Sequence, residues 1–299
     1  MNTQTSHPLK AAVWMSGAVF GFSSMAVLGR KLTLDLDTFE IMAYRSLIGV
    51  LTVLVISTLA GTRGQIRARA LPLHLGRNIS HFTGQNLWLF ALTLIPLAQL
   101  FALEFAYPIL VALGASLFLG ERLTPLRGAT ALLGFIGILI VAQPFGAGGL
   151  SIGLLAAMAC AFGFAGSALF TKRLTRRPDG TVTNILFWLS LMQLGLGVGC
   201  AMMDGQMKLF TAAQLPLLTL FALAGLGAHF CLTTALSLAP ASVVTPIDFL
   251  RLPLIALIAY VLYGEATTWA TYIGASLIFG ANYINILSEA RKSRAARPV

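Results

Sequence analysis

Apolar residues dominate the chain in ten segments, each close to the length of a membrane-spanning helix. A helix that crosses the roughly 30 Å hydrocarbon core needs about 20 mostly apolar residues, because each residue adds 1.5 Å. Short polar, glycine-containing or proline-containing stretches separate the segments, and no long linker lies between them. The pattern predicts an all-α integral membrane protein of ten transmembrane helices. The expected spans are Ala11–Gly29, Phe39–Leu59, Asn78–Leu94, Leu97–Leu119, Leu126–Ala142, Leu150–Lys172, Val182–Met203, Leu215–Leu236, Ala241–Tyr263 and Trp269–Leu287.

Composition and charge support this interpretation. Hydrophobic residues make up 57% of the 299 residues and charged residues only 10%, whereas soluble domains carry about 25% charged residues. Of the twenty Lys and Arg, the expected topology places fifteen on the side of the N-terminus, three on the other side, and Arg45 and Arg251 within helices. This asymmetry predicts a multi-pass inner-membrane protein with both termini in the cytoplasm. It also explains the net charge of +10 without a nucleic-acid partner.

The cysteines do not indicate a metal or disulfide site. Cys160, Cys200 and Cys231 all lie inside apolar segments, and an odd number in such positions is no disulfide framework. We therefore expect no metal and no cofactor. The expected partners are the lipid bilayer and a small-molecule substrate, and the sequence leaves open whether the protein is a monomer or a homodimer.

The chain contains an internal repeat. We divide it into a first five-helix repeat, residues 1–145, and a second, residues 146–299. An odd number of helices per repeat means that the second repeat enters the membrane in the opposite orientation, an arrangement common in secondary transporters. At a shift of 142 residues, Phe20-Gly21-Phe22 matches Phe162-Gly163-Phe164, and at a shift of 144, Pro96 matches Pro240 and Glu104 matches Asp248.

Several motifs carry a family resemblance. They are Asn86-Leu87-Trp88-Leu89-Phe90-Ala91-Leu92, Ile95-Pro96-Leu97-Ala98, Tyr107-Pro108 and Phe118-Leu119-Gly120-Glu121-Arg122-Leu123-Thr124, with Tyr263-Gly264-Glu265-Ala266 in the second half. With them the chain resembles the drug/metabolite transporter superfamily, specifically its ten-helix EamA-type exporters. The resemblance implies a central cavity between the repeats, alternating access, and export of amino acids, aromatic or otherwise neutral ones included. Drugs and nucleoside-like or sugar-like compounds are the alternative substrates.

A membrane-embedded lipid-modifying enzyme is the rival class. Such enzymes need clustered acids for a metal or a nucleophile set, and only Glu104 and Asp248 lie deep within the expected helices, one in each half of the chain. The sequence therefore predicts that the protein is not an enzyme.

Four charged residues fall within the expected hydrocarbon region: Arg45, Glu104, Asp248 and Arg251. Each costs about 2.5–3.5 kcal/mol at a helix centre, so compensation is expected. Asp248 and Arg251 are three residues apart and share a helix face, while Glu104 and Arg45 lie at similar depth. The interpretation is one acid–base pair in each repeat. These pairs either fix helix packing, or one acid binds the substrate or carries a proton.

The third segment carries a polar stripe. Asn78, His81, Gln85 and Trp88 follow one another at spacings of three, four and three, which is one helical face. The stripe either lines the substrate cavity or forms buried structural hydrogen bonds. His229, which aligns with Gln85, is a further cavity candidate.

Aromatic residues and prolines complete the candidates. Trp14, Phe20, Phe162 and Tyr107 either form cavity walls or pack between helices, and glycines beside the phenylalanines would permit close helix approach. Proline frees a backbone carbonyl and kinks a helix. The prolines of the fourth and ninth segments are therefore either hinges for closing one side or fixed kinks: Pro108, Pro246 and Pro253.

Overall fold

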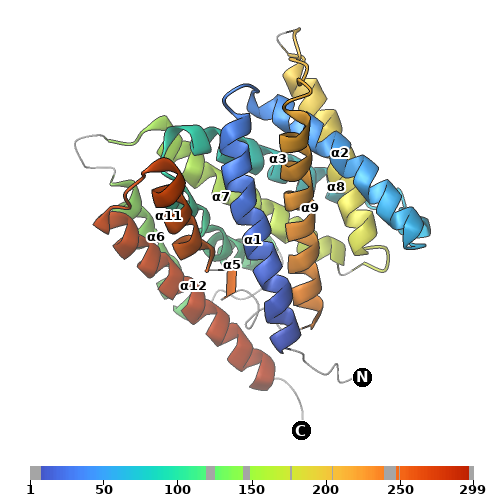
Figure 1. Cartoon of the computed structure of the whole chain (residues 1–299). Coiled ribbons are helices and arrows are strands. Elements are labelled where there is room, and N and C mark those ends of the chain that lie inside the picture. Colours follow the sequence, from blue (N-terminus) through green and yellow to red (C-terminus); the bar gives the residue numbers. More distant parts are fainter. Residues whose placement is uncertain are drawn as a thin grey trace. The chain divides into compact units, whose positions relative to one another are not determined.

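The computed structural model describes residues 8–118, 125–143, 149–175, 177–203, 205–238, 247–248 and 250–295. These residues form helices and turns only (Figure 1). The chain divides into two compact units. Unit 1 contains Met1–Ser24, Pro96–Ser151 and Gly227–Val299, and unit 2 contains Met25–Ile95 and Ile152–Leu226. Each unit therefore takes segments from both predicted repeats.

The helices follow the hydrophobic segments. Five of them are long and apolar enough to cross a membrane, namely α1, α2, α7, α8 and α9, and three apolar stretches are shorter. The protein is an all-α integral membrane protein, as the hydrophobic pattern predicts. The elements are α1 (Pro8–Leu32), α2 (Thr38–Leu59), η1 (Arg63–Gln65), α3 (Leu71–Leu94), α4 (Leu97–Glu104), α5 (Tyr107–Phe118), α6 (Pro125–Ala142), α7 (Ile152–Thr175), α8 (Val182–Ala201), α9 (Leu215–Leu238), α11 (Arg251–Tyr263) and α12 (Trp269–Ala295).

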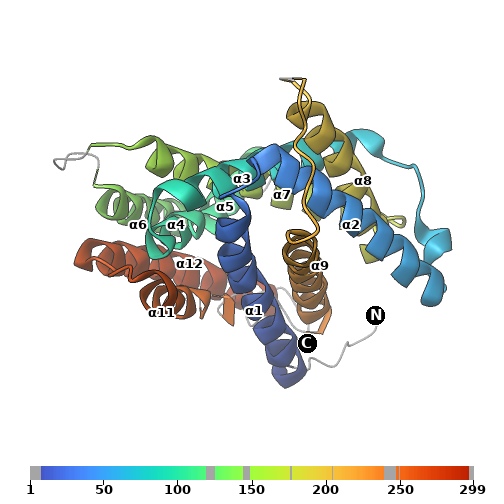
Figure 2. The same ribbon diagram turned by 45° about the horizontal axis from the view of Figure 1, so that its top comes forward.

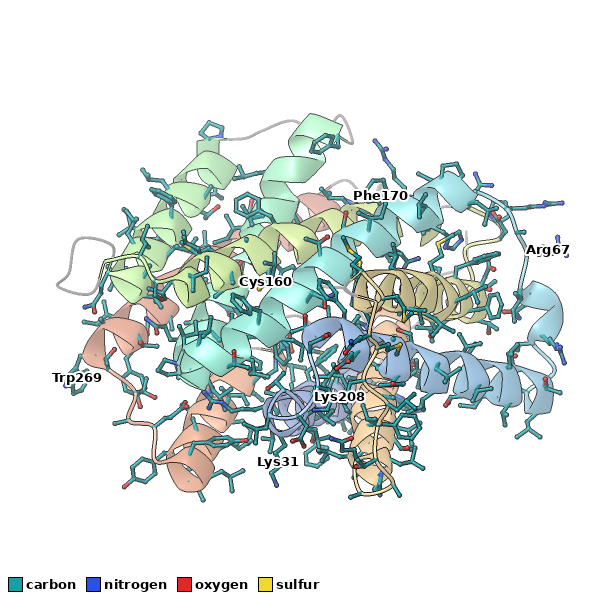
Figure 3. The ribbon with its side chains drawn as sticks, turned by 90° about the horizontal axis from the view of Figure 1, so that it is seen from above. Lys31, Arg67, Cys160, Phe170, Lys208 and Trp269 are labelled. Carbon is teal, nitrogen blue, oxygen red and sulfur yellow. The ribbon has the colours of Figure 1, made fainter. Side chains whose placement is uncertain are left out.

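Unit 2 is built on two helix pairs, α3 with α7 and α2 with α8, which run side by side (Figures 1 and 2). A Cβ atom added to Gly163 of α7 would lie 2.6 Å from the Cα of Gly84 on α3. Two glycines therefore face each other, and the backbones approach closely because neither residue has a side chain. Figure 3 shows Cys160 and Phe170 of α7 along this pair.

Unit 1 contains a second close pair, α6 with α12 (Figure 2). A Cβ atom on Gly137 of α6 would lie 2.7 Å from the carbonyl oxygen of Gly274 on α12. The first part of α1 and the last part of α9 add a small apolar core in which Met15 and Ala235 are fully buried. Glycine-mediated contact between helices from the two halves of the sequence thus recurs in both units.

The fourth and ninth segments differ from the prediction of continuous helices. Residues 97–118 form two helices, α4 and α5, and in the described part of the ninth segment Leu250 lies in a turn before α11 begins at Arg251. The third helix begins at Leu71, earlier than expected, so Arg77 belongs to α3 and is buried rather than lying in a loop. Apolar composition sets which segments are helical, but it does not show where a helix is interrupted.

Candidate functional site

The break in the fourth segment of the fold is the starting point of the candidate site. Helix α4 ends at Glu104, and α5 begins at Tyr107. The carbonyl oxygen of Phe105, in the break, accepts a hydrogen bond from Nδ2 of Asn282 on α12 at 2.8 Å. A membrane helix can be interrupted only where such partners replace the lost backbone bonds. The break is thus supported from a neighbouring helix.

The prolines occupy helix starts, contrary to the expectation that they interrupt helix interiors. Pro108 is the second residue of α5, and Pro253 is the third residue of α11. Proline is tolerated in the first turn of a helix, because its missing N–H would have no partner there. Pro246 lies outside the described residues. A hinge role for these prolines stays a prediction.

A buried charge cluster lies where helix α4 ends and helix α11 begins. Nη2 of Arg251, the first residue of α11, lies 3.2 Å from Oδ2 of Asp248 and 3.5 Å from Oε1 of Glu104, the last residue of α4. The three side chains are only 6–12% exposed. One arginine therefore binds two acids, one from each half of the chain, inside unit 1.

Three phenylalanine rings surround the guanidinium group. The centre of the Arg251 guanidinium lies 5.0, 5.3 and 4.8 Å from the ring centroids of Phe22, Phe101 and Phe105. These distances are within the range of cation–π attraction, which strengthens when water is excluded. The rings also replace water around the ions, so the electrostatic interactions of the cluster act at a low local dielectric constant.

The placement of these charges on their helices is unfavourable on its own. Arg251 puts a cation at the N-terminus of α11, and Glu104 puts an anion at the C-terminus of α4. Helix dipoles disfavour both positions, by about 0.3–1 kcal/mol each. The ion pair between the two side chains offsets this cost. Stability alone gives little reason for such a cluster, and charged residues inside membrane proteins commonly mark functional sites.

The structure contains one of the two predicted acid–base pairs but not the other. Asp248 and Arg251 are in contact, as their spacing predicts. The expected pair of Glu104 with Arg45 is wrong, because Glu104 forms its ion pair with Arg251 of the other half. Arg45 belongs to unit 2, where Nη1 donates to Sδ of Met42 at 3.4 Å and the guanidinium lies 5.9 Å from the Phe221 ring.

The polar stripe of α3 is buried within unit 2. Asn78 is fully buried and donates through Nδ2 to the carbonyl oxygens of His74 and Trp188 and to Sδ of Met192. Nδ1 of His81 lies 3.0 Å from Nε2 of Gln193 on α8. The first half of the stripe thus joins α3 to α8 through hydrogen bonds. This arrangement fits buried structural hydrogen bonding rather than lining of a substrate cavity.

The second half of the stripe is different. Gln85 and Trp88 are 6% and 4% exposed, and within the part of the chain that the structure describes, the amide of Gln85 has no hydrogen-bond partner. Gln85 therefore offers a donor and an acceptor to a ligand, one helical turn from the indole ring of Trp88.

Sequence reasoning missed three polar residues of this region. Gln193 and Arg77 are buried, and Nε of Arg77 donates to Oγ1 of Thr171 on α7 at 2.7 Å. Trp188 supplies one of the carbonyl oxygens that hold Asn78. A signal for Gln193 existed, because it is an amide in the middle of the apolar helix α8. Arg77 carried no such signal, since it resembled one more loop arginine.

The remaining aromatic candidates are distributed over both units. Phe20 in unit 1 and Phe162 in unit 2 are 72% and 65% exposed, so each faces away from the core of its own unit. Trp14 forms an edge-to-face pair with Phe230 at 5.7 Å, and His229 a similar pair with Phe22 at 5.2 Å. His229 thus reaches the phenylalanine cage of the charge cluster.

Tyr107, the first residue of α5, also belongs to the surroundings of the charge cluster. It interacts electrostatically with Glu104, Asp248 and Arg251. The structure therefore brings six of the predicted residues together in unit 1. His229 lies against the Phe22 ring, and Pro253 lies in the same helix turn as Arg251. The other four form the charge cluster or lie beside it: Glu104, Tyr107, Asp248 and Arg251.

A cavity of about 490 Å³ opens in unit 2 between the turn after α1 and the ends of α3 and α8. Its volume is in the range of ligand sites, and Phe39, Phe90 and Cys200 contribute to its walls. Its acid, Asp37, already caps α2 by accepting hydrogen bonds from two backbone N–H groups. We therefore assign the functional site to the buried polar groups rather than to this cavity.

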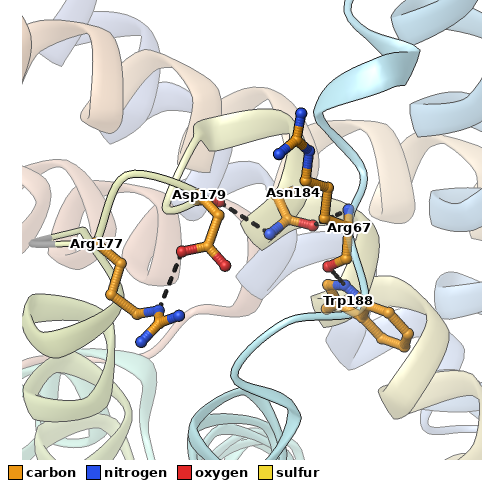
Figure 4. Close-up of polar contacts among 5 residues, drawn as sticks. All are labelled: Arg67, Arg177, Asp179, Asn184 and Trp188. Atoms are coloured by element: carbon orange, nitrogen blue, oxygen red, sulfur yellow. Dashed lines mark hydrogen bonds and ion pairs between the residues drawn. The ribbon is translucent and has the colours of Figure 1, made fainter.

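At the opposite ends of the unit 2 helices, a polar network joins two loops (Figure 4). Oδ1 of Asn184 accepts from the backbone N–H of Arg67, and Nε1 of Trp188 donates to the carbonyl oxygen of Arg67. Nδ2 of Asn184 donates to the carbonyl oxygen of Asp179, whose carboxylate binds Arg177 at 3.0 Å. The network holds the loop before α3 against the start of α8.

These features define a class of protein: a multi-pass membrane protein with interrupted helices and buried charges, the construction typical of secondary transporters. The model of the EamA-like transporter family matches the chain twice, over residues 9–143 and 151–287. The chain belongs to the EamA-like transporter family. It is a membrane transporter of small molecules and not an enzyme.

Comparison with individual proteins refines this picture. The chain is similar to the riboflavin transporter of Rhizobium johnstonii, with 34% identity over 226 residues that cover 74% of this chain and 72% of the relative. It is also similar to the S-adenosylmethionine uptake transporter of Rickettsia prowazekii, with 24% identity over 99% of both chains. A solved crystal structure with 21% identity shares the fold, with a TM-score of 0.60 over 92% of this chain and 98% of that chain.

Proposed function

We propose that this protein transports a flat heteroaromatic metabolite of the riboflavin class across the inner membrane by alternating access. The observation that carries the proposal is the 34% identity to a riboflavin transporter. Riboflavin combines a flat three-ring system, hydrogen-bonding ring edges and a polyhydroxyl chain. A binding site for such a molecule needs an aromatic surface and amide or hydroxyl groups beside it.

Gln85 and Trp88 supply these two kinds of group. Both lie on one face of α3, three residues apart, and both are buried. The indole ring offers a flat surface for stacking, and the amide of Gln85 can both donate to and accept from a heterocyclic ring edge. The candidate group carries no net charge, which suits a neutral vitamin.

Amino acid export, the substrate expected from the sequence, is the competing proposal. It is supported by the resemblance to EamA-type exporters and by the mixture of aromatic and uncharged polar candidates, which also suits zwitterions. The amino acid hypothesis needs a group for the α-carboxylate and another for the α-ammonium. Of the buried ions, Arg251 and its two acids already bind one another.

The test is flux into liposomes that contain only this protein. We expect saturable transport of labelled riboflavin, competed by unlabelled riboflavin and not by phenylalanine or tryptophan. Gln85→Ala should raise KM about tenfold, since loss of one ligand hydrogen bond costs about 1–1.5 kcal/mol. Thr83→Ala is the matched control, because Thr83 lies on the same helix and is exposed.

Three results bear on the proposal. Riboflavin transport with a Gln85→Ala defect and a normal Thr83→Ala variant supports both the substrate and the site. Riboflavin transport with an unchanged Gln85→Ala variant supports the substrate and refutes the role of Gln85. Saturable flux of amino acids without flux of riboflavin refutes the proposal and favours the amino acid exporter.

A further inference from the structure

Asp248 is an acid whose charge is incompletely compensated. Its ion-pair partner is Arg251, and the same nitrogen of that arginine, Nη2, also faces Glu104. The distances of 3.2 and 3.5 Å show that neither acid has the arginine to itself. Oδ1 of Asp248 is buried and has no hydrogen-bond partner among the described residues. An ionised carboxylate in an apolar site is costly unless its oxygens are paired.

Arg251 also has an unused hydrogen-bond donor at this site. Nε of Arg251 is buried and also lacks a hydrogen-bond partner among the described residues, although the residue is only 5% exposed. A guanidinium group offers five N–H donors in a fixed planar arrangement. The unpaired nitrogen and the unpaired oxygen show that the cluster is not in its fully bonded arrangement. A proton bound to Asp248 would remove its negative charge, which is the costly part of burying an unpaired carboxylate oxygen.

We propose that Asp248 is a proton-binding site that couples proton movement to transport, with Arg251 switching between Asp248 and Glu104. In the deprotonated form, Arg251 is shared between two carboxylates. When a proton from the aqueous phase binds the Asp248 carboxylate, the resulting neutral acid attracts Arg251 less. Arg251 then binds Glu104 more strongly, and this contact joins the start of α11 to the end of α4.

The proposal must account for the other titratable groups around Asp248. Arg251 faces it from α11, Glu104 from α4 and Tyr107 from α5. His229 on α9 contacts the Phe22 ring, which itself covers Arg251. Asp248 differs from Glu104 in having a buried oxygen with no partner in the described structure. This difference is the reason for assigning the proton to Asp248.

The first experiment measures the proton directly. We would record infrared difference spectra of the full chain in lipid nanodiscs while the pH is lowered from alkaline to mildly acidic. The carbonyl band of a newly protonated carboxylic acid should appear in the wild type. It should be absent in Asp248→Asn, present in Glu104→Gln, and present in Asp179→Asn, an acid of the loop network outside the membrane. This measurement needs no substrate.

The second experiment measures coupling and rests on the proposed function. A gradient of one pH unit should accumulate riboflavin about tenfold in liposomes if one proton moves per substrate. Asp248→Asn should abolish this accumulation and leave exchange of labelled for unlabelled riboflavin measurable. Asp248→Glu restores a titratable group and should recover part of the response. Exchange by Asp248→Asn also shows that the variant is folded.

The infrared and transport experiments together distinguish failure of the proton site from failure of the proposed substrate. A wild-type protonation band that persists in Asp248→Asn overturns the proposal, as does gradient-driven accumulation by that variant. Accumulation driven by sodium and independent of pH overturns it as well. If riboflavin is not carried at all, the function proposed above fails, while loss of the infrared band in Asp248→Asn still supports the proton site.

Discussion

The contact between α3 and α7 makes a quantitative prediction for Gly163→Ala. An added Cβ atom would lie 2.6 Å from Cα and 2.7 Å from the backbone N of Gly84, and 2.8 Å from the carbonyl oxygen of Ser80. Favourable carbon–carbon contacts begin at about 3.5 Å. All three neighbours are backbone atoms, which cannot rotate away, so the two helices must separate by roughly 1 Å.

Such a separation weakens a large contact. Overpacking a well-packed interface costs about 1–3 kcal/mol, and α3 and α7 run alongside each other over much of their 24 residues each. Alanine itself favours a helix over glycine by about 1 kcal/mol, so the steric cost has to exceed this gain. We expect the apparent melting temperature of Gly163→Ala in detergent to fall by several degrees.

The assay is thermal unfolding followed by tryptophan fluorescence, with Gly199→Ala as the matched control. Gly199 lies in α8, and an added Cβ atom would meet nothing within 4 Å in the structure. The control should melt at the wild-type temperature or slightly above it. If Gly163→Ala melts as the control does, the close approach of α3 and α7 is not the source of stability that we infer.

Four further changes test other parts of the structure. Arg251→Met should destabilise the protein by about 3–5 kcal/mol, since it removes the arginine that two buried acids share, and thermal unfolding measures this. Glu265 accepts a hydrogen bond from the backbone N of Leu97 at 2.9 Å, so Glu265→Ala, which removes the acceptor, should raise deuterium uptake at the start of α4. Burial raises the pKa of Asp179, but its hydrogen bonds lower the pKa by more, so the pKa lies below its usual value. The ionised carboxylate therefore stabilises the fold above about pH 4, and this stabilisation is lost as the pH falls through the lower pKa of the folded state. Asp179→Asn should flatten this acid limb of the stability curve. In a variant without native cysteines, Lys208→Cys should react with an impermeant maleimide added outside intact cells, whereas labelling only after lysis would reverse the predicted orientation.

The sequence was sufficient for the helices because membrane insertion depends mainly on local apolar length. The contact of Asp248 with Arg251 could also be predicted, since residues three apart share a helix face. The partner of Glu104 could not. It depends on the end of α4 and the start of α11 meeting within unit 1, and hydropathy does not show where a helix breaks.

The α3 stripe shows the same boundary between local and tertiary information. Its helical spacing predicts that Asn78, His81, Gln85 and Trp88 share a face, and all four are buried. The spacing does not tell that His81 meets Gln193, whereas Gln85 has no partner in the described structure. That distinction depends on how far α8 extends along α3, and it separates a structural residue from a candidate for substrate binding.

The ion pair between Glu104 and Arg251 also has a consequence for biosynthesis. The two residues are 147 positions apart, so a ribosome that adds about 5–20 residues per second releases the arginine roughly 7–30 s after the glutamate. During that interval the end of α4 holds a membrane-embedded acid without its counter-ion. A nascent chain that stalls in this window holds an uncompensated charge within the bilayer, where such a charge is costly.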